Sequence, residues 1–153
     1  MLRRGTPDDL PSLIEVSLAS FATVTWQRTV DAKFGPLGGL DWRERWRRRV
    51  ERALQEQTFL VLLEEDRIAG YACGTVDPVT GLGHLDILAV DPAYQGKGYG
   101  RRLLYAFEDW VRSQGGSHLT LESLTDNETA NRLYQSERYQ VLASHLNWFK
   151  KIY

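Results

Sequence analysis

The chain has 153 residues, of which 42% are hydrophobic and 25% charged, a composition typical of a globular domain. This composition excludes wholesale disorder, collagen-like repeats and coiled-coil rods. The 19 basic and 20 acidic residues leave a formal net charge of −1, so no global positive field attracts nucleic acid or an anionic membrane. We expect one domain over residues 1–153.

The sequence also restricts the cellular setting. Residues 1–9 lack the apolar core of a signal peptide, and no apolar run approaches the roughly 20 residues of a membrane span. The single cysteine, Cys73, can form neither an internal disulfide nor a cysteine-based metal site. We therefore expect a cytoplasmic protein with no bound metal, no membrane association and no nucleic-acid partner.

The first third of the chain predicts two helices separated by a loop. Thr6-Pro7-Asp8-Asp9 supplies a cap, a first-turn proline and acidic residues near the positive end of a helix, and apolar residues then recur at helical spacing to Phe21. Residues 22–39 break this pattern and predict a loop. Asp41 caps a second helix, whose buried stripe begins with Trp42.

The second helix carries six arginines outside its apolar stripe: Arg43, Arg45, Arg47, Arg48, Arg49 and Arg52. A run of arginines can bind nucleic acid or an acidic substrate. Because Glu44 and Glu51 are interspersed and the net charge is near zero, we interpret this surface as a solvated face.

From Thr58 onward the apolar pattern changes to that of strands alternating with helices. The expected elements are strands 58–63 and 68–76 with a hairpin turn at 64–67, strand 84–90, helix 98–114, strand 118–122, helix 126–136, and a closing strand pair at 139–143 and 146–153. The order βααβββαβαββ predicts a mixed sheet with helices on both faces.

The most informative stretch is a glycine-rich turn between a strand and a helix. The strand Leu85–Val90 is followed by residues 91–100, which contain three glycines within five positions. Glycines let backbone N–H groups approach an anion closely, and a helix N-terminus adds about half a positive charge. With Lys97, Arg101 and Arg102 at the rim, the turn predicts a phosphate or pyrophosphate site.

Other glycine-rich turns fit less well. A P-loop requires Ser or Thr after its lysine, whereas Lys97 is followed by Gly98. A dinucleotide-binding turn requires a third glycine where Arg101 stands, and too few residues follow Glu122 to complete a doubly wound sheet. Dinucleotide binding therefore stays a weaker alternative, and a plain loop with glycines for tight turning is the remaining one.

Two motifs carry a resemblance to a known family. Gln95-Gly96-Lys97-Gly98-Tyr99-Gly100 resembles the acyl-CoA signature of the GNAT superfamily of N-acyltransferases, Gln/Arg-x-x-Gly-x-Gly/Ala. Asn127 to Tyr134 is similar to the family's Asn-x-x-Ala-x-x-Leu-Tyr helix. The resemblance covers residues 59–145 and implies an α/β fold with a mixed, mostly antiparallel sheet of about seven strands and about four helices.

The family pattern usually continues to a glycine, which this chain lacks. Arg138 stands where the chain would turn left-handed after the short helix. A left-handed conformation costs a non-glycine residue about 1 kcal/mol.

The resemblance implies an N-acetyltransferase that moves an acetyl group from acetyl-CoA to a primary amine by direct attack. The acceptor is a small-molecule amine or an amine of a peptide or protein. A CoA-binding module without catalysis is the alternative from another functional class. The cofactor-binding residues that the resemblance implies are Leu88, Ala89, Val90, Gln95, Gly96, Lys97, Gly98, Tyr99, Gly100, Arg101 and Asn127.

In this assignment, backbone N–H groups from Gly96 to Arg101 hold the pyrophosphate. The pantetheine arm lies beside Leu88-Ala89-Val90, where a bulge opens the strand edge. The N–H of Leu88 or its neighbour then faces the thioester oxygen.

The same resemblance makes Tyr134 the general acid that protonates the departing thiolate, the alternative being a half-buried aromatic residue. For the base we rank Glu122 first, Asp86 second and His84 third, with a bridging water possible. The spacing from Glu122 to Asn127 resembles that in the family's protein N-terminal acetyltransferases. Alternation along the strand predicts that His84, Asp86 and Leu88 share one face.

Three further expectations concern the rest of the chain. Direct transfer needs no cysteine nucleophile, so Cys73 is interpreted as a buried strand residue. The resemblance implies that residues 22–42 help to shape the acceptor site, where Trp26 is free to line a pocket. The C-terminal strand Leu146–Tyr153 can help to form a homodimer.

Overall fold

The computed structural model describes all residues 1–153 and places five strands in one sheet. The elements, in chain order, are β1 (Leu2–Arg4), the short helix η1 (Pro7–Asp9), α1 (Leu10–Phe21), α2 (Trp26–Phe34), α3 (Trp42–Glu56), β2 (Thr58–Glu64), β3 (Arg67–Val76), β4 (Leu82–Val90), η2 (Pro92–Tyr94), α4 (Tyr99–Ser113), β5 (His118–Leu121) and α5 (Glu128–Ser136).

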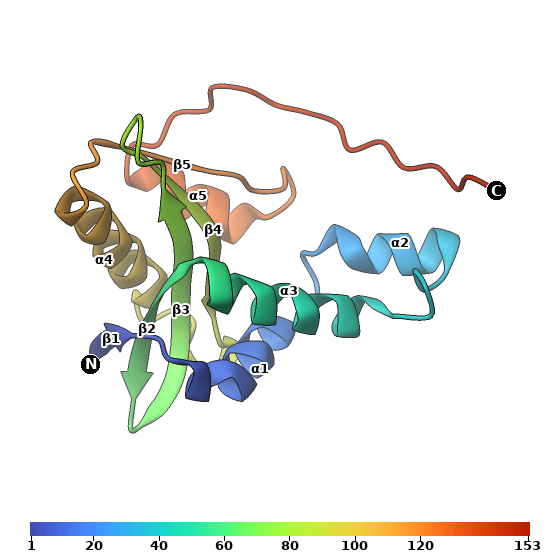
Figure 1. The fold of residues 1–153 in the computed structure, drawn as a ribbon, viewed down its shortest axis with the longest axis horizontal. Helices are drawn as coiled ribbons and strands as arrows, with labels where there is room; N and C mark the ends of the chain where they lie inside the picture. Colours follow the sequence, from blue (N-terminus) through green and yellow to red (C-terminus); the bar gives the residue numbers. More distant parts are fainter.

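The sheet has the order β1-β2-β3-β4-β5, and every neighbouring pair is antiparallel except the parallel pair β4–β5 (Figure 1). Glu65 and Asp66, both with positive φ, form the tight turn between β2 and β3, which confirms the predicted hairpin. Parallel strands need a crossover connection, and α4 provides it between β4 and β5. This connection places the start of α4 just beyond the end of β4.

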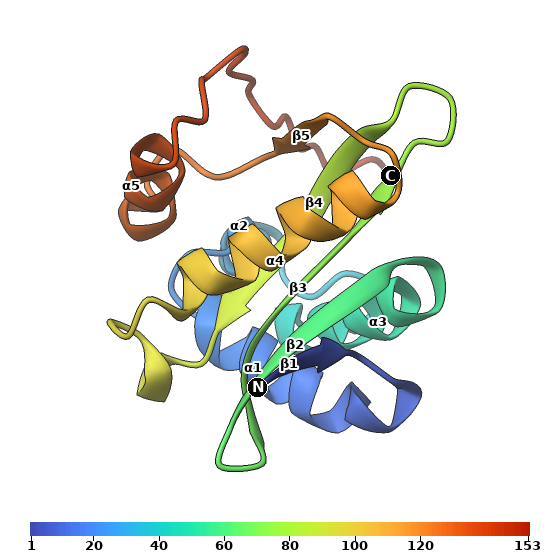
Figure 2. The ribbon, with the colours of Figure 1, turned by 90° about the vertical axis from the view of Figure 1, so that its left-hand side faces the viewer.

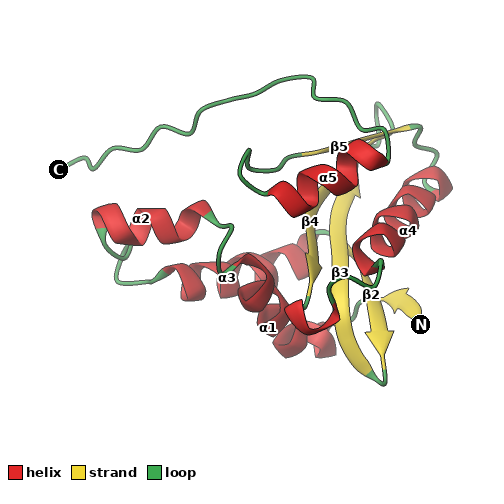
Figure 3. Ribbon diagram, turned by 180° about the vertical axis from the view of Figure 1, so that it is seen from behind, coloured by secondary structure: helices red, strands yellow, loops and turns green.

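Helices cover both faces of the sheet, as Figures 2 and 3 show. One hydrophobic core joins α1 and α3 to the sheet through residues such as Leu13, Val50 and Ile87. A second core joins α4 to the opposite face through Leu104, Phe107 and Leu85. The α/β architecture with helices on two faces is thus confirmed.

The first core contains a buried polar contact that links α1 to β3. The Ser17 hydroxyl donates to the Leu13 carbonyl at 2.6 Å and lies 2.5 Å from the Tyr71 hydroxyl. Because the single Ser17 proton is used, Tyr71 is the donor in the second bond. Both side chains are fully buried, so the bond satisfies two groups that are shielded from water.

The loop predicted for residues 22–39 is wrong, because the structure has the helix α2 there. Thr25 caps α2 by accepting from the Gln27 N–H, and Gly35 ends it with a φ of 78°. Only Val30 of this helix is buried, so the apolar periodicity that reveals most helices is absent. Polar contacts hold α2 instead: the Arg45 guanidinium contacts the Asp31 carboxylate at 2.7 Å.

The closing strand pair predicted at 139–143 and 146–153 is also wrong. No helix or strand follows α5, and residues 140–153 are exposed. The sheet therefore ends at β5 with five strands instead of about seven, while α2 raises the number of α-helices to five. A strand exists only where another strand bonds to it, and the C-terminal segment extends away from the sheet (Figure 1).

The left-handed turn after α5 is present at the predicted residue. Arg138 has a φ of 66°, and the next N–H, from Tyr139, bonds to the Tyr134 carbonyl at 3.0 Å. This bond closes the C-terminal end of α5 in the way that a glycine usually permits.

Cys73 is buried in β3, as predicted. None of the helices is long and apolar enough to cross a membrane.

Candidate functional site

Strand β4 has a free edge over its second half. On one side β3 pairs with it as far as Val90. On the other side β5 pairs only up to Leu85, opposite Leu121, and the two strands then separate. Residues 86–90 of β4 therefore have no strand partner on that side, which leaves room for a ligand alongside the strand.

The hydrogen-bond pattern shows which groups face this free edge. The Asp91 N–H bonds to the Ala69 carbonyl of β3 at 2.8 Å. Residues of an antiparallel strand alternate between facing their partner and facing away, so Leu88 and Val90 direct their N–H and C=O groups to the free edge. The Gln95 side chain donates to the Val90 carbonyl at 3.2 Å. The Leu88 N–H has no strand partner on this edge.

Ala89 lies between Leu88 and Val90 and faces away from the free edge. Its side chain is buried in the core with α1 and α3, and its backbone groups face β3.

A bulge at Asp86 rotates β4 and overturns one prediction. Ile87 pairs with Cys73 and Leu85 with Gly74, so Asp86 is the extra residue. Leu85 packs in the α4 core and Ile87 in the α1–α3 core. Asp86 contacts Arg49 of α3, whereas Leu88 packs against the α4 core, so the prediction that these two residues share one face is wrong.

The glycine-rich turn presents a run of unpaired backbone donors. Gly96 and Gly98 have φ values of 81° and 80°, which few other residues adopt. No backbone bond outside the helices and strands is donated by residues 96–101, and the first helical bond of α4 is from Arg102 to the Gly98 carbonyl. A Cβ at Gly96 or Gly98 meets no atom within 4 Å, so the turn is open at these two residues. Unpaired N–H groups at a helix N-terminus are able to bind an anion such as a pyrophosphate.

The charged side chains around the turn are occupied by other contacts. Lys97 lies 3.3 Å from the Glu64 carboxylate on the β2–β3 hairpin, and Arg102 stacks over the Tyr99 ring. The Tyr99 hydroxyl and Lys97 both hold the pKa of the Glu64 carboxyl below its usual range. The anion site therefore depends mainly on the backbone and on the helix N-terminus.

Helix α5 packs beside the start of α4. A Cβ on Gly100 would lie 3.5 Å from the Leu133 side chain, so a small residue there leaves space for α5. Arg101 contacts Glu137 at 2.6 Å, and the Tyr105 hydroxyl donates to the same carboxylate at 2.8 Å. These contacts fix α5 next to the glycine turn.

Tyr134 lies on α5 and is half-buried against the α4 core. Its hydroxyl makes no hydrogen bond within the chain, and burial raises the pKa of Tyr134 to about 12. The phenol therefore carries its proton throughout the physiological pH range, as a proton donor must. Asn127 caps α5, since its side chain accepts from the Ala130 N–H at 3.4 Å.

The candidate bases meet where β4 and β5 separate, but their surroundings differ. Asp86 is bound by Arg49 at 3.0 Å and by the Gln57 amide at 2.9 Å. Glu122 directly follows the last paired residue of β5, is exposed, and has no ion pair or hydrogen bond within the chain. His84 is half-buried within the paired part of β4.

No cluster of three or more His, Cys, Asp or Glu residues is arranged to hold a metal ion.

Two residues of this region carried no recognised signal in the sequence. Asn131 on α5 donates from its amide to the Leu124 carbonyl at 3.0 Å and accepts from the Ser123 hydroxyl, so it shapes the loop after Glu122. Gln57 holds Asp86, as described above.

The predicted pocket residue Trp26 is 42% exposed on α2. The shallow depression on that helix is lined by other residues.

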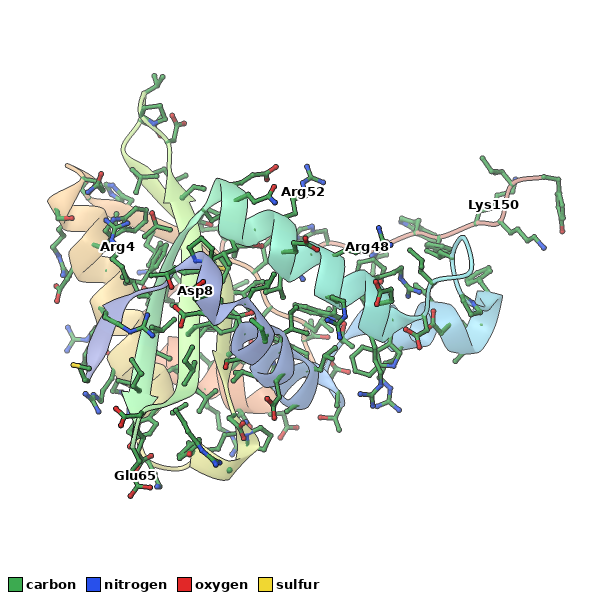
Figure 4. All side chains as sticks on the ribbon, turned by 60° about the horizontal axis from the view of Figure 1, so that its bottom comes forward. Arg4, Asp8, Arg48, Arg52, Glu65 and Lys150 are labelled. Carbon is green, nitrogen blue, oxygen red and sulfur yellow. The ribbon has the colours of Figure 1, made fainter.

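The arginines of α3 mostly have partners within the chain. Arg47 and Arg48 lie near Glu44, Arg52 contacts Glu56, and Arg45 and Arg49 reach Asp31 and Asp86. In Figure 4, Arg48 and Arg52 extend outward from α3. Five of the six arginines thus have a carboxylate partner, in agreement with a solvated face.

The free edge of β4 thus lies next to a glycine-rich turn with unpaired backbone N–H groups. The acetyltransferase (GNAT) family model matches residues 24–138 of the chain. The chain therefore belongs to the GNAT family of acetyltransferases.

Curated relatives and solved structures agree with this family. A ribosomal protein bS18-alanine N-acetyltransferase of Haemophilus ducreyi is 36% identical over 88 residues, 56% of this chain and 58% of the relative. The N-alpha-acetyltransferase RimI of Mycobacterium tuberculosis is 41% identical over 63 residues, 41% of this chain and 38% of the relative. The matches span between 21% and 58% of the curated relatives' own lengths.

Among solved structures, the PaiA N-acetyltransferase of Thermoplasma acidophilum, in complex with coenzyme A, has a TM-score of 0.77 at 18% identity. The likeness covers 95% of this chain and 92% of that one. The ribosomal-protein-S18-alanine N-acetyltransferase of Escherichia coli has a TM-score of 0.67 at 24% identity, with coverage of 90% and 76%. Both likenesses show the same fold.

The glycine turn can be tested by a pair of matched substitutions. Gly98→Leu places a side chain into the open space at the turn, so we expect acetyl-CoA affinity to fall by at least about tenfold. Gly115→Leu, at the other end of α4, has the same backbone strain (φ of 84° against 80°) and equally open space, so it should bind normally. Calorimetric titration measures both, and equal affinities would refute the pyrophosphate assignment.

Proposed function

We propose that this protein transfers an acetyl group from acetyl-CoA to a primary amine, and that the acceptor is the α-amine at a protein or peptide N-terminus. The observation that carries the proposal is the run of free N–H groups at residues 96–101 beside the free edge of β4. These two features can hold the two ends of one elongated ligand. Family membership supports acetyl-CoA as that ligand.

The residues at the turn and the strand edge suit acetyl-CoA, which supplies the acetyl group as an activated thioester. The N–H groups of residues 96–101 bind its pyrophosphate, and the edge of β4 binds its extended arm. The Leu88 N–H is aimed at the carbonyl oxygen of the thioester, where a fixed donor stabilises negative charge that develops during transfer. Gln95 keeps the Val90 carbonyl occupied and so orients the turn.

Tyr134 acts as the general acid in this proposal. Its half-buried hydroxyl has no competing partner, and burial keeps it protonated. A proton held at the Tyr134 hydroxyl can pass to the departing sulfur, which leaves more readily as a thiol than as a thiolate.

Glu122 acts as the base, directly or through a water. It lies where β4 and β5 separate, and its carboxylate is free to accept a proton from the attacking amine. Asp86 lies opposite but is held by Arg49 and Gln57, which occupy both of its oxygens.

The acceptor class follows from the acidity of the amine and from the relatives. A terminal α-amine has a pKa of about 7.7–8.0, whereas that of a lysine side chain is about 10.4, so the α-amine is far easier to deprotonate near neutral pH. Two curated relatives are named as acetyltransferases of a ribosomal protein alanine or of N-alpha amines. Both arguments favour a protein or peptide N-terminus over a lysine side chain.

The acceptor is tested with a peptide that has a free N-terminal alanine and an internal lysine. We expect the protein and acetyl-CoA to add one acetyl group, located at the α-amine by fragment mass spectrometry. A matched peptide with a blocked N-terminus should remain unmodified. Acetylation of the lysine would contradict the acceptor class, and binding of acetyl-CoA without any transfer would indicate a non-catalytic module.

The acid is tested with Tyr134→Phe, which removes only the hydroxyl. We expect kcat to fall by about 100-fold while acetyl-CoA affinity is little changed. The control is Tyr139→Phe, because its ring lies 5.9 Å from that of Tyr134 but its hydroxyl bonds to Glu108. Steady-state kinetics measure both, and an unchanged kcat in Tyr134→Phe would exclude its role as acid.

The base is tested by comparing Glu122→Gln with Asp86→Asn over a range of pH. A base must be deprotonated, so the rate of the unaltered protein rises with pH through the pKa of that base. We expect Glu122→Gln to lower kcat/KM by about 100-fold and to remove this rise, whereas Asp86→Asn retains it. The opposite result would make Asp86 the base, and retention of the rise in both would exclude both carboxylates.

A further inference from the structure

The hairpin between β2 and β3 lies next to the glycine-rich turn, although the two are about 30 residues apart in the sequence. Gly70 of β3 pairs with Val90, the last residue of β4. Glu64, the last residue of β2, pairs with Arg67 at the base of the hairpin. Because the turn begins where β4 ends, this pairing brings the end of β2 close to residues 96–99.

The Glu64 carboxylate contacts two residues of the turn. The Lys97 ammonium lies 3.3 Å from one of its oxygens and 3.5 Å from the other. The Tyr99 hydroxyl bonds to the same carboxylate, and this bond lowers the pKa of Glu64 and raises the pKa of Tyr99. Lys97 and Tyr99 are the two neighbours of Gly98 in the sequence. One carboxylate from a distant strand thus holds the turn on both sides of this glycine.

The backbone of the turn has little else to fix its shape. Gly96 and Gly98 both have positive φ, and a Cβ on either would meet no atom within 4 Å. Glycine has more accessible conformations than any other residue, so ordering two glycines costs more conformational entropy than ordering other residues. The two contacts with Glu64 restrict these conformations before any ligand is present.

We propose that Glu64 is a positioning residue for acetyl-CoA, which holds Lys97 and Tyr99 so that the backbone N–H groups between them stay directed at the pyrophosphate. The inference rests on the proposed function, because that function places the pyrophosphate at this turn. Glu64 acts through its two partners and does not itself contact the ligand. Its effect is preorganisation: a turn that already has its bound shape loses less entropy when the ligand binds.

The sign of the change in affinity tests this role. Glu64→Met keeps the length of the side chain but removes the negative charge and the acceptor. Loss of a negative charge alone would strengthen the binding of an anion, because like charges repel. Loss of the two contacts frees the turn, and we expect the Kd of acetyl-CoA to rise by about fivefold. Calorimetric titration measures the change, and an equal or lower Kd would overturn the proposal.

The matched control is Asp66→Asn in the same hairpin, next to Glu65, which Figure 4 labels. Asp66 is exposed, and its φ of 63° is one that asparagine tolerates. This substitution also removes one negative charge but no contact with the turn. We expect it to leave the Kd of acetyl-CoA unchanged or slightly lower. A rise equal to that of Glu64→Met would mean that the charge of the hairpin acts, and not the contacts of Glu64.

A pair of substitutions shows whether Glu64 acts through Tyr99. Tyr99→Phe removes only the hydroxyl that bonds to Glu64 and leaves the backbone N–H in place. We expect it to raise the Kd of acetyl-CoA by about twofold in the unaltered protein and to have no further effect in Glu64→Met, since residues that act as a unit are not additive. Independent effects that multiply would refute the coupling.

Steady-state kinetics separate positioning from chemistry and from a general loss of structure. With the N-terminal alanine peptide as acceptor, we expect Glu64→Met to raise the KM of acetyl-CoA while kcat at saturation is unchanged. A fall in kcat without a rise in KM would contradict a role in binding. If the unaltered protein does not bind acetyl-CoA, the proposed function and this role both fail. If it binds and Glu64→Met binds equally well, only the role of Glu64 fails.

Discussion

The separation of β5 from β4 is the constraint on which the site depends. A fully paired β4 would satisfy all its N–H and C=O groups within the sheet and leave none for a ligand. The bulge at Asp86 lies where the pairing ends. A bulge bends its strand and disrupts the ladder, so one extra residue both turns Asp86 toward α3 and accompanies the loss of the β5 partner beyond Leu85.

The other parts of the site follow from the same separation. The parallel pairing of β4 with β5 requires a crossover, and that crossover brings the N-terminus of α4 to the end of the exposed strand edge. The bonds of Glu137 to Arg101 and Tyr105 then fix α5, and with it Tyr134, to the same helix. The glycine-rich turn and the proposed acid are thus both attached to α4, and a displacement of α4 moves them together.

Features with a local physical cause were predictable from the sequence. The Thr6 cap of η1, the Asp41 cap of α3, the hairpin at Glu65–Asp66, the glycine turn and the left-handed Arg138 each depend on a few neighbouring residues. Features that depend on distant partners were not. The resemblance implied a bulge in this strand, but the alternating residues do not mark its position at Asp86, so the facing of Asp86 and Leu88 was predicted wrongly. Helix α2 buries only Val30 and depends on Arg45, far along the chain, for its attachment.

Helix α2 is attached to the rest of the chain by few contacts. This helix has little apolar contact of its own, so the ion pair of Arg45 with Asp31 and the packing of Phe149 on Phe34 contribute much of what holds it. The family resemblance implies that residues 22–42 shape the acceptor site. Since a helix with a single buried residue resists displacement poorly, the loss of either contact would shift α2 and change the shape of residues 22–42.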